Sequence, residues 1–486
     1  MFKELTLKEV SEGIRSKRFK PSEVAAEAIG RTRELNPGLN AYITETGELA
    51  EKAAKEADER QAAGKLKSVL DGVPGALKDI VNTKGIRSTS ASKILGNFIP
   101  PYNATVAQKL FDAGLVLTGK TNTDEFACGG STEFSAFGVT RNPWDRQRVA
   151  GGSSGGSAAA LAAQTCYYAI GTDTGGSIRL PASFCGITGL KVSYGRVSRS
   201  GVTAMASSLD TIGPFAKTVE DLAMVLQVIA GNDPKDATTP KKEVPDYAAN
   251  LKKDIKGLKI GVPKEYFVEG LSPEVEKLVR QAMKEYEKAG AVLKEISLPY
   301  TRYAVAIYYI IMPAELSANL ARYDGIRYGL KPEGEITDII DQYYKTRDQG
   351  FGPEVKRRIL TGTYVLSAGY FDAYYRKALQ VRTLIKQDFE KAFSEVDVIM
   401  TPVSPGPAFK IGEKSSNPLS MYLEDAFTIP ASMAGIPALS LPCGLTAESL
   451  PAGLQIIAPQ FAEQQLLQIG HAYQQMTDWH KKFPEI

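Results

Sequence analysis

Residues 151–160, GGSSGGSAAA, and residues 171–186, GTDTGGSIRLPASFCG, are the stretches that decide the fold. In the first, a glycine-serine loop opens into an alanine-rich segment that we expect to be helical. The second is another polar glycine loop, and the strand-like run YYAIG at residues 167–171 leads into it. From about residue 68 to 230, short β-branched runs alternate with helical segments such as ATVAQKLFDAG, which predicts a layered α/β architecture with a mainly parallel sheet.

Outward from these loops, we expect residues 1–486 to form a single domain with three segments. Residues 1–66 have helical spacing, and residues 67–230 hold both loops and the surrounding α/β elements. A polar, proline-containing excursion at 231–255 precedes a third segment, residues 256–486, where we expect a helical substrate-side region and then late strands of the same sheet. Within this last segment, residues 272–296 are predicted to form one helix.

The composition restricts the possible functions. With 58 basic and 55 acidic side chains, the net charge of +3 is too small to demand a polyanionic partner. The chain has two histidines, and its four cysteines lack C-x-x-C spacing, so we expect no metal site and buried free thiols at Cys128, Cys166, Cys185 and Cys443.

The N-terminus lacks the apolar core of a signal peptide, and no window holds 18 uninterrupted apolar residues. We therefore expect a bacterial or archaeal cytoplasmic protein that has no membrane span. An organellar protein that has lost its transit peptide would look the same.

The loop at 151–155 admits three interpretations. It matches the G-x-S-x-G nucleophile elbow, but the only histidines available for a triad, His471 and His480, lie near the end of the chain. A phosphate-binding loop would use backbone N–H groups at the helix start, yet neither G-K-[ST] nor G-x-G-x-x-G fits. The third interpretation is structural, because glycines permit close packing of a helix on a strand.

The second loop and an upstream lysine favour a serine nucleophile that needs no histidine. The turn Thr174-Gly175-Gly176-Ser177 can direct several backbone N–H groups at a developing oxyanion, and Ser177 ends this turn as a candidate nucleophile. Lys78 ends the apolar run GVPGALKDI, where burial would lower its pKa and leave it neutral. A neutral lysine can take a proton from a bridging serine, which in turn deprotonates the attacking one.

Taken together, the lysine in its K-D context and the two loops resemble the amidase signature family, whose members are Ser-cisSer-Lys amide hydrolases. The resemblance implies an α/β fold with a central mixed β-sheet covered by helices on both faces. It also implies that Ser177 is the acyl-enzyme nucleophile and that Lys78 is the base. Ser153 is then the bridging serine, and the peptide bond that precedes it, Gly152–Ser153, is cis.

Further stretches, including GFGPEVKRRILTGTYVLSAGYFDAYY and IPASMAGIPALSLPCG, are similar to the branch of this family that supplies ammonia to tRNA-dependent amidotransferases. That resemblance implies a glutaminase with two partners, a kinase/transferase (the B subunit) and a small C subunit, which together act on misacylated Glu-tRNA(Gln) or Asp-tRNA(Asn). ATP and Mg²⁺ would be used by the partner, with no cofactor in this chain. Arg358 is implied to bind the α-carboxylate of glutamine and Asp425 its α-amino group, a match of charges.

Three positions depart from the pattern expected for this branch. Ile80 and Ser432 stand where asparagine is usual, and Phe134 replaces the asparagine of T-E-N-S. These departures put in doubt the polar shell around the substrate. Two other hypotheses therefore stay open at this point: a stand-alone amidase of small or aryl amides, and a non-catalytic scaffold that binds the other subunits.

Overall fold

The computed structural model describes residues 2–415 and 417–486. Its strands lie in a single sheet with the order β1-β3-β2-β4-β6-β5-β10-β11-β9-β7-β8, counted over the described residues. The strands are β1 (Tyr42–Glu45), β2 (Pro74–Lys78), β3 (Val116–Thr121), β4 (Tyr168–Asp173), β5 (Thr188–Lys191), β6 (Thr211–Ala216), β7 (Lys259–Pro263), β8 (Val292–Ile296), β9 (Val398–Pro402), β10 (Ala438–Leu445) and β11 (Pro451–Ile457).

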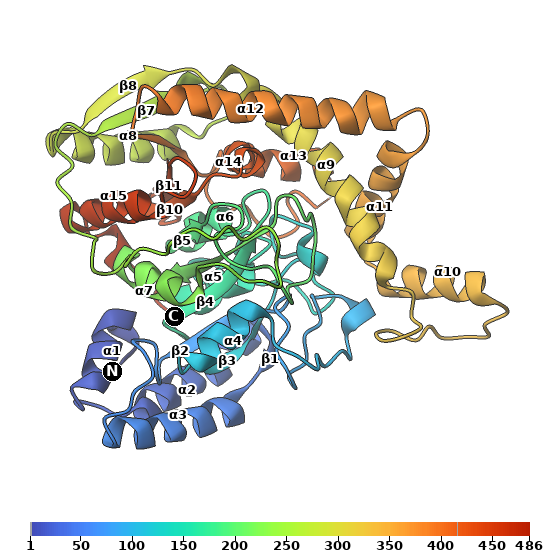
Figure 1. Ribbon diagram of the computed structural model, residues 1–486, viewed down its shortest axis with the longest axis horizontal. Helices are drawn as coiled ribbons and strands as arrows, with labels where there is room; N and C mark the ends of the chain where they lie inside the picture. Colours follow the sequence, from blue (N-terminus) through green and yellow to red (C-terminus); the bar gives the residue numbers. More distant parts are fainter. Residues whose placement is uncertain (1, 416) are drawn as a thin grey trace.

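Helices cover this sheet on both faces, which confirms the expected α/β class (Figure 1). The helices are α1 (Leu7–Arg15), α2 (Pro21–Leu39), α3 (Gly47–Ala62), α4 (Thr105–Asp112), α5 (Gly155–Ala162), α6 (Arg179–Cys185), α7 (Val219–Ile229), α8 (Pro273–Lys288), α9 (Ala304–Asn319), α10 (Ile339–Gly350), α11 (Pro353–Leu366), α12 (Lys377–Phe393), α13 (Pro418–Tyr422), α14 (Ile429–Ala434) and α15 (Glu463–Met476).

The sheet is mixed rather than mainly parallel. Parallel pairing holds within β3-β2-β4 and within β8-β7-β9. The pairs between these two blocks, and the edge pair β1–β3, are antiparallel. The expectation of a mainly parallel sheet was therefore wrong for the middle strands, because β10 and β11 form a hairpin and β6 pairs with both β4 and β5. The mixed sheet that the family resemblance implies is confirmed.

The N-terminal segment is not wholly helical. Helix α1 begins with a capping box, in which Thr6 and Glu9 each accept a backbone N–H of the other. Helix α2 ends at Leu39, and the left-handed backbone of the capping residue Asn40 (φ +51°) turns the chain into strand β1. This strand pairs with β3 at the edge of the sheet, so part of the expected helical segment belongs to the sheet.

The single helix predicted for residues 272–296 is two elements. Helix α8 ends at Lys288, and Gly290 has a φ of +94°, a conformation that favours glycine. The chain then reverses into strand β8, which pairs in parallel with β7. The run that follows the glycine, AVLKEI, is short and rich in β-branched and apolar residues, which favours a strand.

The pairing of β2 with β4 positions the catalytic candidates. The two strands are parallel and wholly buried, with Leu77 opposite Ile170. Lys78, the last residue of β2, is therefore level with the end of β4, where the second glycine loop begins. Helix α5 packs against both strands, which brings the first glycine loop to the same edge.

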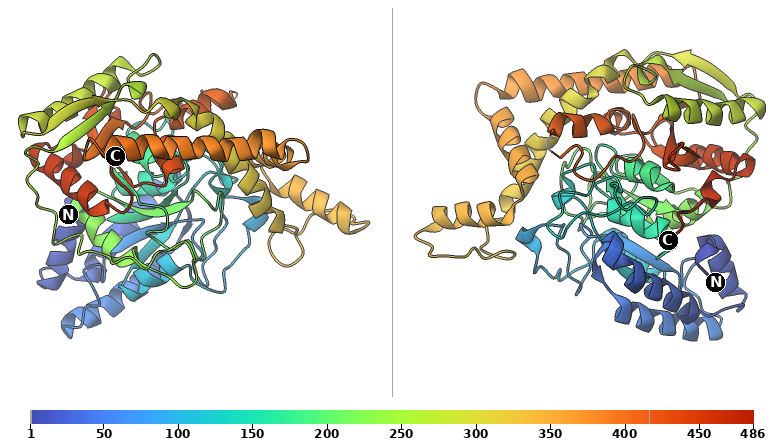
Figure 2. Two further views of the ribbon diagram at one scale, coloured as in Figure 1. Left: turned by 45° about the horizontal axis from the view of Figure 1, so that its top comes forward. Right: turned by 180° about the vertical axis from the view of Figure 1, so that it is seen from behind.

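Helices α9 to α12 form a separate layer beside the sheet. Figure 1 shows α12 along one side and α10 extending away from the body of the molecule, and Figure 2 shows the same projection from behind. One stretch, Pro299–Arg322, is long and apolar enough to cross a membrane by length and composition, and half of its most apolar window is buried. Its central helix α9 packs against α11, α12 and α14, which is how a core helix behaves.

Candidate active site

Lys78 is fully buried at the end of β2 and is surrounded by hydroxyl groups. Its Nζ atom lies 2.8 Å from Ser153 Oγ, 2.9 Å from Ser154 Oγ and 2.9 Å from Thr172 Oγ1. The contact with Ser153 joins two residues that the sequence predicts for the site. Ser154 and Thr172 are not among the predicted residues, although both lie within the quoted stretches.

Burial lowers the pKa of Lys78 from its usual value near 10.5 to about 7. The carboxylates of Asp124, Asp173 and Asp210 and the thiol of Cys128 act against this shift. A substantial share of the lysine is then neutral near pH 7, compared with roughly one molecule in a few thousand for a free side chain. The amine can therefore accept a proton near neutral pH.

The first glycine loop is fixed by close contacts. The Gly152–Ser153 peptide bond is cis, as the family resemblance implies. A Cβ atom on Gly152 would lie 2.3 Å from Asp124 Oδ2, so only glycine fits there. The Asp124 carboxylate accepts the backbone N–H groups of Thr132 and Phe134, and burial raises its pKa to about 6. Asp124 thus holds the neighbouring loop against the serine loop.

The second loop lies between β4 and α6. Ser154 N–H donates to the carbonyl of Ser177 at 3.2 Å, which ties the two loops together. The buried Asp173 carboxylate accepts the N–H of Ile178 and pairs with Arg179, with Nη2 2.9 Å from Oδ1. In the part of the chain that the structure describes, no hydrogen bond joins the Ser153 and Ser177 hydroxyls, and such bonds are often long in enzymes without substrate.

The turn that carries Ser177 is held from its other end by Asp210. Thr174 Oγ1 donates to Asp210 Oδ1 at 2.7 Å, and the same carboxylate accepts the backbone N–H groups of Met205 and Ala206. Burial raises the pKa of Asp210 to about 6. The oxyanion-hole role suggested for Thr174, Gly175, Gly176 and Ser177 stays a prediction.

Arg358 is buried on helix α11. Its Nε donates to Glu354 Oε1 at 2.8 Å, and its guanidinium carbon lies 5.5 Å from the ring centre of Tyr309 and 5.6 Å from that of Tyr422. Among the described residues, Nη1 makes only a weak contact, with the sulfur of Met312 at 3.8 Å. The guanidinium therefore keeps N–H groups available for a ligand while stacking contacts fix its position.

Asp425 lies beside the Ser177 turn. A Cβ atom on Gly176 would be 3.0 Å from Asp425 Oδ1, and one on Gly130 would be 3.6 Å from Oδ2. Asp425 is buried, with 8% of its surface exposed. Among the described residues, no hydrogen bond to its carboxylate is present. Burial and the charge of Asp173 raise its pKa to about 7, against the opposing effect of Arg358. A buried carboxylate without a partner favours a cationic ligand.

The three departures lie in different surroundings. Ser432 Oγ accepts from Arg179 Nη2 at 2.9 Å and so supports the Asp173–Arg179 pair. Phe134 packs against a small apolar cluster that includes Phe184, and Ile80 borders a cavity near the lysine. Ser432 and Phe134, which stand where asparagine was expected, therefore make structural contacts of their own.

The histidine triad is not formed. His471 has Glu220, Lys8 and Lys252 as its charged neighbours, and neither histidine hydrogen-bonds to Ser153 or Ser177 over residues 2–415 and 417–486. The four cysteines are free and buried, as expected. Within those same residues, no group of three or more His, Cys, Asp or Glu side chains could hold a metal ion.

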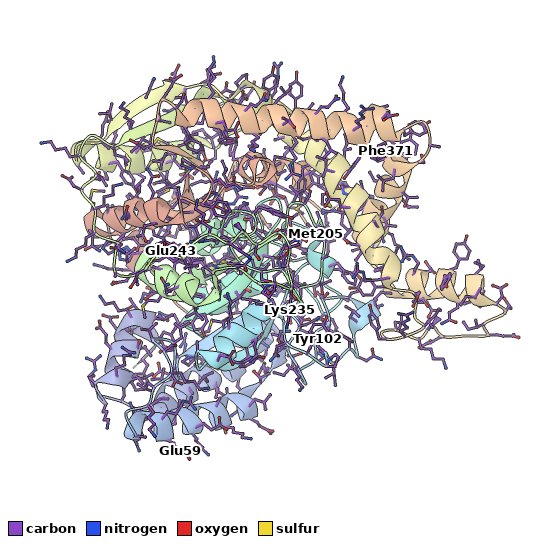
Figure 3. The ribbon with its side chains drawn as sticks, in the orientation of Figure 1. Glu59, Tyr102, Met205, Lys235, Glu243 and Phe371 are labelled. Carbon is purple, nitrogen blue, oxygen red and sulfur yellow. The ribbon has the colours of Figure 1, made fainter. Side chains whose placement is uncertain are left out.

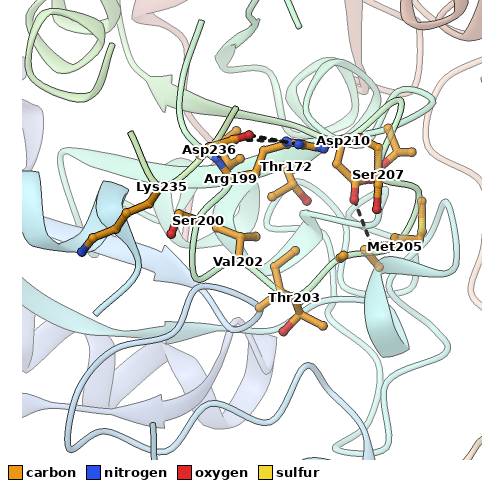
Figure 4. Close-up of a pocket in the computed structure, with 15 residues that line it drawn as sticks. Thr172, Arg199, Ser200, Val202, Thr203, Met205, Ser207, Asp210, Lys235 and Asp236 are labelled. Carbon is orange, nitrogen blue, oxygen red and sulfur yellow. Dashed lines mark hydrogen bonds and ion pairs between the residues drawn. The ribbon is translucent and has the colours of Figure 1, made fainter. Parts of the chain in front are cut away.

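A cavity of about 210 Å³ borders the lysine site. Thr172 and Thr174 are among the residues that line it, as are Lys235 and Arg199, which is paired with Asp236 at 3.1 Å (Figure 4). Figure 3 shows two of the lining residues, Met205 and Lys235, in the central part of the molecule. Of the three hydroxyl groups around Lys78 Nζ, the one on Thr172 belongs to a lining residue.

Comparisons with known proteins agree with this geometry. The family model described as Amidase matches residues 23–467. The chain is 55% identical over 482 residues to the A subunit of glutamyl-tRNA(Gln) amidotransferase from Carboxydothermus hydrogenoformans, a match that covers 99% of both chains. It is 57% identical over 465 residues to the protein of the same name in Thermodesulfovibrio yellowstonii, with 96% of both covered.

Two solved structures extend the comparison. The A subunit of glutamyl-tRNA(Gln) amidotransferase from Thermotoga maritima is 40% identical, with a TM-score of 0.82 and coverage of 100% of this chain and 98% of that one. The peptide amidase of Stenotrophomonas maltophilia is 30% identical, with a TM-score of 0.84 and coverage of 98% and 97%.

Proposed function

Because this chain belongs to the amidase family, and is thus an amidase-type enzyme, we propose that it hydrolyses glutamine and supplies ammonia as the A subunit of a tRNA-dependent amidotransferase. One observation carries this proposal: buried Arg358 and Asp425 interact electrostatically, Asp425 lies beside the Ser177 turn, and among the described residues both keep hydrogen-bonding groups without a strong partner. A free amino acid has an α-carboxylate and an α-ammonium, which these two groups would bind. The relatives named above support the same assignment.

In this proposal Ser177 Oγ attacks the side-chain amide carbon of glutamine. Its proton passes through Ser153 to neutral Lys78 and returns by the same route to the departing nitrogen, which leaves as ammonia. The backbone N–H groups of the turn from Thr174 to Ser177 stabilise the oxyanion. Water then attacks the Ser177 ester and Lys78 takes the water proton through Ser153. The proton returns by the same route to Ser177 Oγ as the ester bond breaks, which releases glutamate and restores neutral Lys78.

The remaining assignments follow from the same proposal. A kinase/transferase, the B subunit, would use ATP and Mg²⁺ to activate misacylated tRNA and would receive the ammonia, and a small C subunit would complete the complex. This chain would need no cofactor of its own. We further propose that it acts in the cytoplasm and that residues 1–486 form one domain, since strands from all three segments join one sheet.

The test is ammonia release by the purified chain from glutamine, asparagine and a panel of simple amides, with Ser177→Ala as the blank. We expect a preference for glutamine and slow release that increases when the partner subunits are added. Rapid release from simple amides without partners would instead identify a stand-alone amidase. Ammonia release that is unchanged in Lys78→Ala and Ser153→Ala would identify a scaffold with a contaminating activity.

Substitutions at the two substrate-binding candidates should act on binding. Arg358→Lys and Asp425→Asn should each raise the KM for glutamine by about 100-fold. The lysine keeps the charge but loses the two parallel N–H donors that pair with a carboxylate, and the asparagine leaves the ammonium of the amino acid without a counter-charge in a buried site. Arg357→Lys, which changes the neighbouring and partly exposed arginine, is the matched control and should leave KM within about twofold. A KM for glutamine that stays unchanged in both test variants would remove the amino-acid assignment.

The pH dependence should follow Lys78 and Asp425. Lys78 must be neutral to act as a base, so kcat should rise as the pH increases through about 7. Asp425 must be ionised to bind glutamine, and its pKa is also about 7, so kcat/KM should fall more steeply than kcat at acid pH. Asp425→Asn should remove that extra steepness. A kcat that is flat from acid to alkaline pH would contradict the role of Lys78.

A further inference from the structure

The three hydroxyl groups around Lys78 Nζ define how the amine is oriented. A neutral amine has two N–H bonds and one lone pair, and the three contacts with Ser153, Ser154 and Thr172 match these three directions in number. The hydroxyl that faces the lone pair must donate its hydrogen, and the other two must accept. Only one of the three arrangements serves the proposed relay, namely the one in which Ser153 donates.

Ser154 cannot be the donor to Lys78. Its hydroxyl donates to the carbonyl of Thr172 at 3.0 Å and accepts the backbone N–H of the same residue at 3.2 Å. Its one hydrogen is therefore used, and towards Lys78 it can only accept. Ser154 thus takes one N–H of the lysine, which leaves Ser153 and Thr172 to share the second N–H and the lone pair.

Thr172 has a second place to direct its hydroxyl hydrogen, whereas Ser153 does not. Thr172 lines the cavity of about 210 Å³, and Figure 4 shows its side chain among the residues that face this space. A cavity of this size admits water, to which the hydroxyl can donate. Ser153 Oγ is fully buried, and its only hydrogen-bond contact among the described residues is Lys78. All hydroxyl hydrogens are satisfied when Thr172 accepts from Lys78 and Ser153 donates.

We propose that Thr172 positions the base: it accepts one N–H of Lys78, and together with Ser154 it keeps the lone pair directed at Ser153. The inference rests on the proposed relay and adds a residue to it. Strand β4 supplies the required rigidity, since Thr172 pairs with Ile212 of β6, and Ile170, two residues earlier, pairs with Leu77 of β2. Thr172 does not contact the substrate in this account and acts through the lysine.

The test compares Thr172→Val, which removes the hydroxyl but keeps the shape, with Thr172→Ser, which keeps the hydroxyl. Thr172→Val should lower kcat by about tenfold, since the amine can turn its lone pair away from Ser153. It should also move the rising limb of kcat to lower pH by up to about one unit, because the ammonium form loses an acceptor. The groups that face Lys78, namely Asp124, Asp173, Asp210 and Cys128, are unchanged in this variant.

Thr172→Ser should restore both the rate, to within about threefold, and the position of the limb. Thr211→Val is the matched control, because it makes the same substitution at a buried threonine of the adjoining strand β6. The hydroxyl of Thr211 donates to the carbonyl of Asp173. This variant should leave the rising limb of the kcat–pH profile at its wild-type pH. Thr172→Ala, which only removes atoms, should shift the rising limb of kcat to lower pH as Thr172→Val does. It replaces Thr172→Val in the test if that variant does not fold.

Two results would overturn the inference. In the first, Thr172→Val and Thr172→Ala keep the wild-type kcat and the wild-type pH of its rising limb. In the second, Thr172→Ser lowers kcat as much as Thr172→Val does, which would assign the effect to the shape of the side chain and not to its hydroxyl. These results are distinct from a failure of the proposed function, because the wild-type chain and the Ser177→Ala blank report on the relay itself, and the comparison can be made with whichever amide the chain hydrolyses best.

Discussion

Ser177→Ala should lower ammonia release from glutamine by about four to six orders of magnitude, which leaves only background hydrolysis. The substitution removes one oxygen atom, and this is the atom that we expect to form the ester with the substrate. The nearby contacts are backbone ones, such as the Ser154 N–H to the Ser177 carbonyl, so the loop should keep its shape. Glutamine binding through Arg358 and Asp425 should persist, and isothermal titration with the variant can measure it.

Ser183→Ala is the matched control for this experiment. Ser183 is a buried serine on helix α6, six residues after Ser177 along the chain, and its loss should change kcat by no more than about threefold. If Ser177→Ala retained more than about one hundredth of the wild-type kcat while Ser183→Ala behaved normally, another nucleophile would have to be sought.

Lys78→Met should lower kcat by about three to five orders of magnitude, because Ser153 then loses the amine that takes its proton. The protein provides a control of the same kind in Lys191. Both lysines are fully buried, and burial lowers the pKa of each to about 7. Lys191, however, donates to the carbonyls of Val192 and Ile436 rather than to serine hydroxyls, so Lys191→Met should keep kcat within about tenfold of the wild type.

The double variant Lys78→Met with Ser153→Ala tests whether the two residues form one relay. Residues that act as a unit give non-additive losses, so the double variant should be no more than about tenfold worse than the poorer single one. Losses that multiply across the two substitutions would indicate two separate contributions. Equal losses in Lys78→Met and Lys191→Met would show that burial, not proton transfer, is what the assay measures.

The central parts of the site could be predicted from the sequence because they depend on local patterns. Lys78 ends an apolar run that had to be a buried strand, and the two glycine loops each precede a helix start. Arg358 and Asp425 came from the family resemblance, since a charged residue on a helix looks like an ordinary surface group when the sequence is considered alone. The burial of Arg358 depends on how α11 packs against α9, which lies far from it along the chain.

Other features depend on long-range pairing and left no comparable signal. The single helix predicted for residues 272–296 included strand β8. The strand, Val292–Ile296, is short, and one glycine before it is a weak signal for the end of a helix. The contacts of Thr172 and Asp210 follow from strand register, which no pattern of residues in β4 or β6 reveals. The antiparallel middle of the sheet also depends on which strands become neighbours, and the order of elements along the chain does not state this.

The most direct test of the central claim is mass spectrometry of the chain quenched in acid during turnover with glutamine, with the partner subunits present if they are needed for turnover. The account predicts one added glutamyl group, carried by the peptide that contains Ser177, and no adduct in Ser177→Ala. An adduct on a different residue, or ammonia release that depends on the chain but passes through no covalent intermediate, would contradict it.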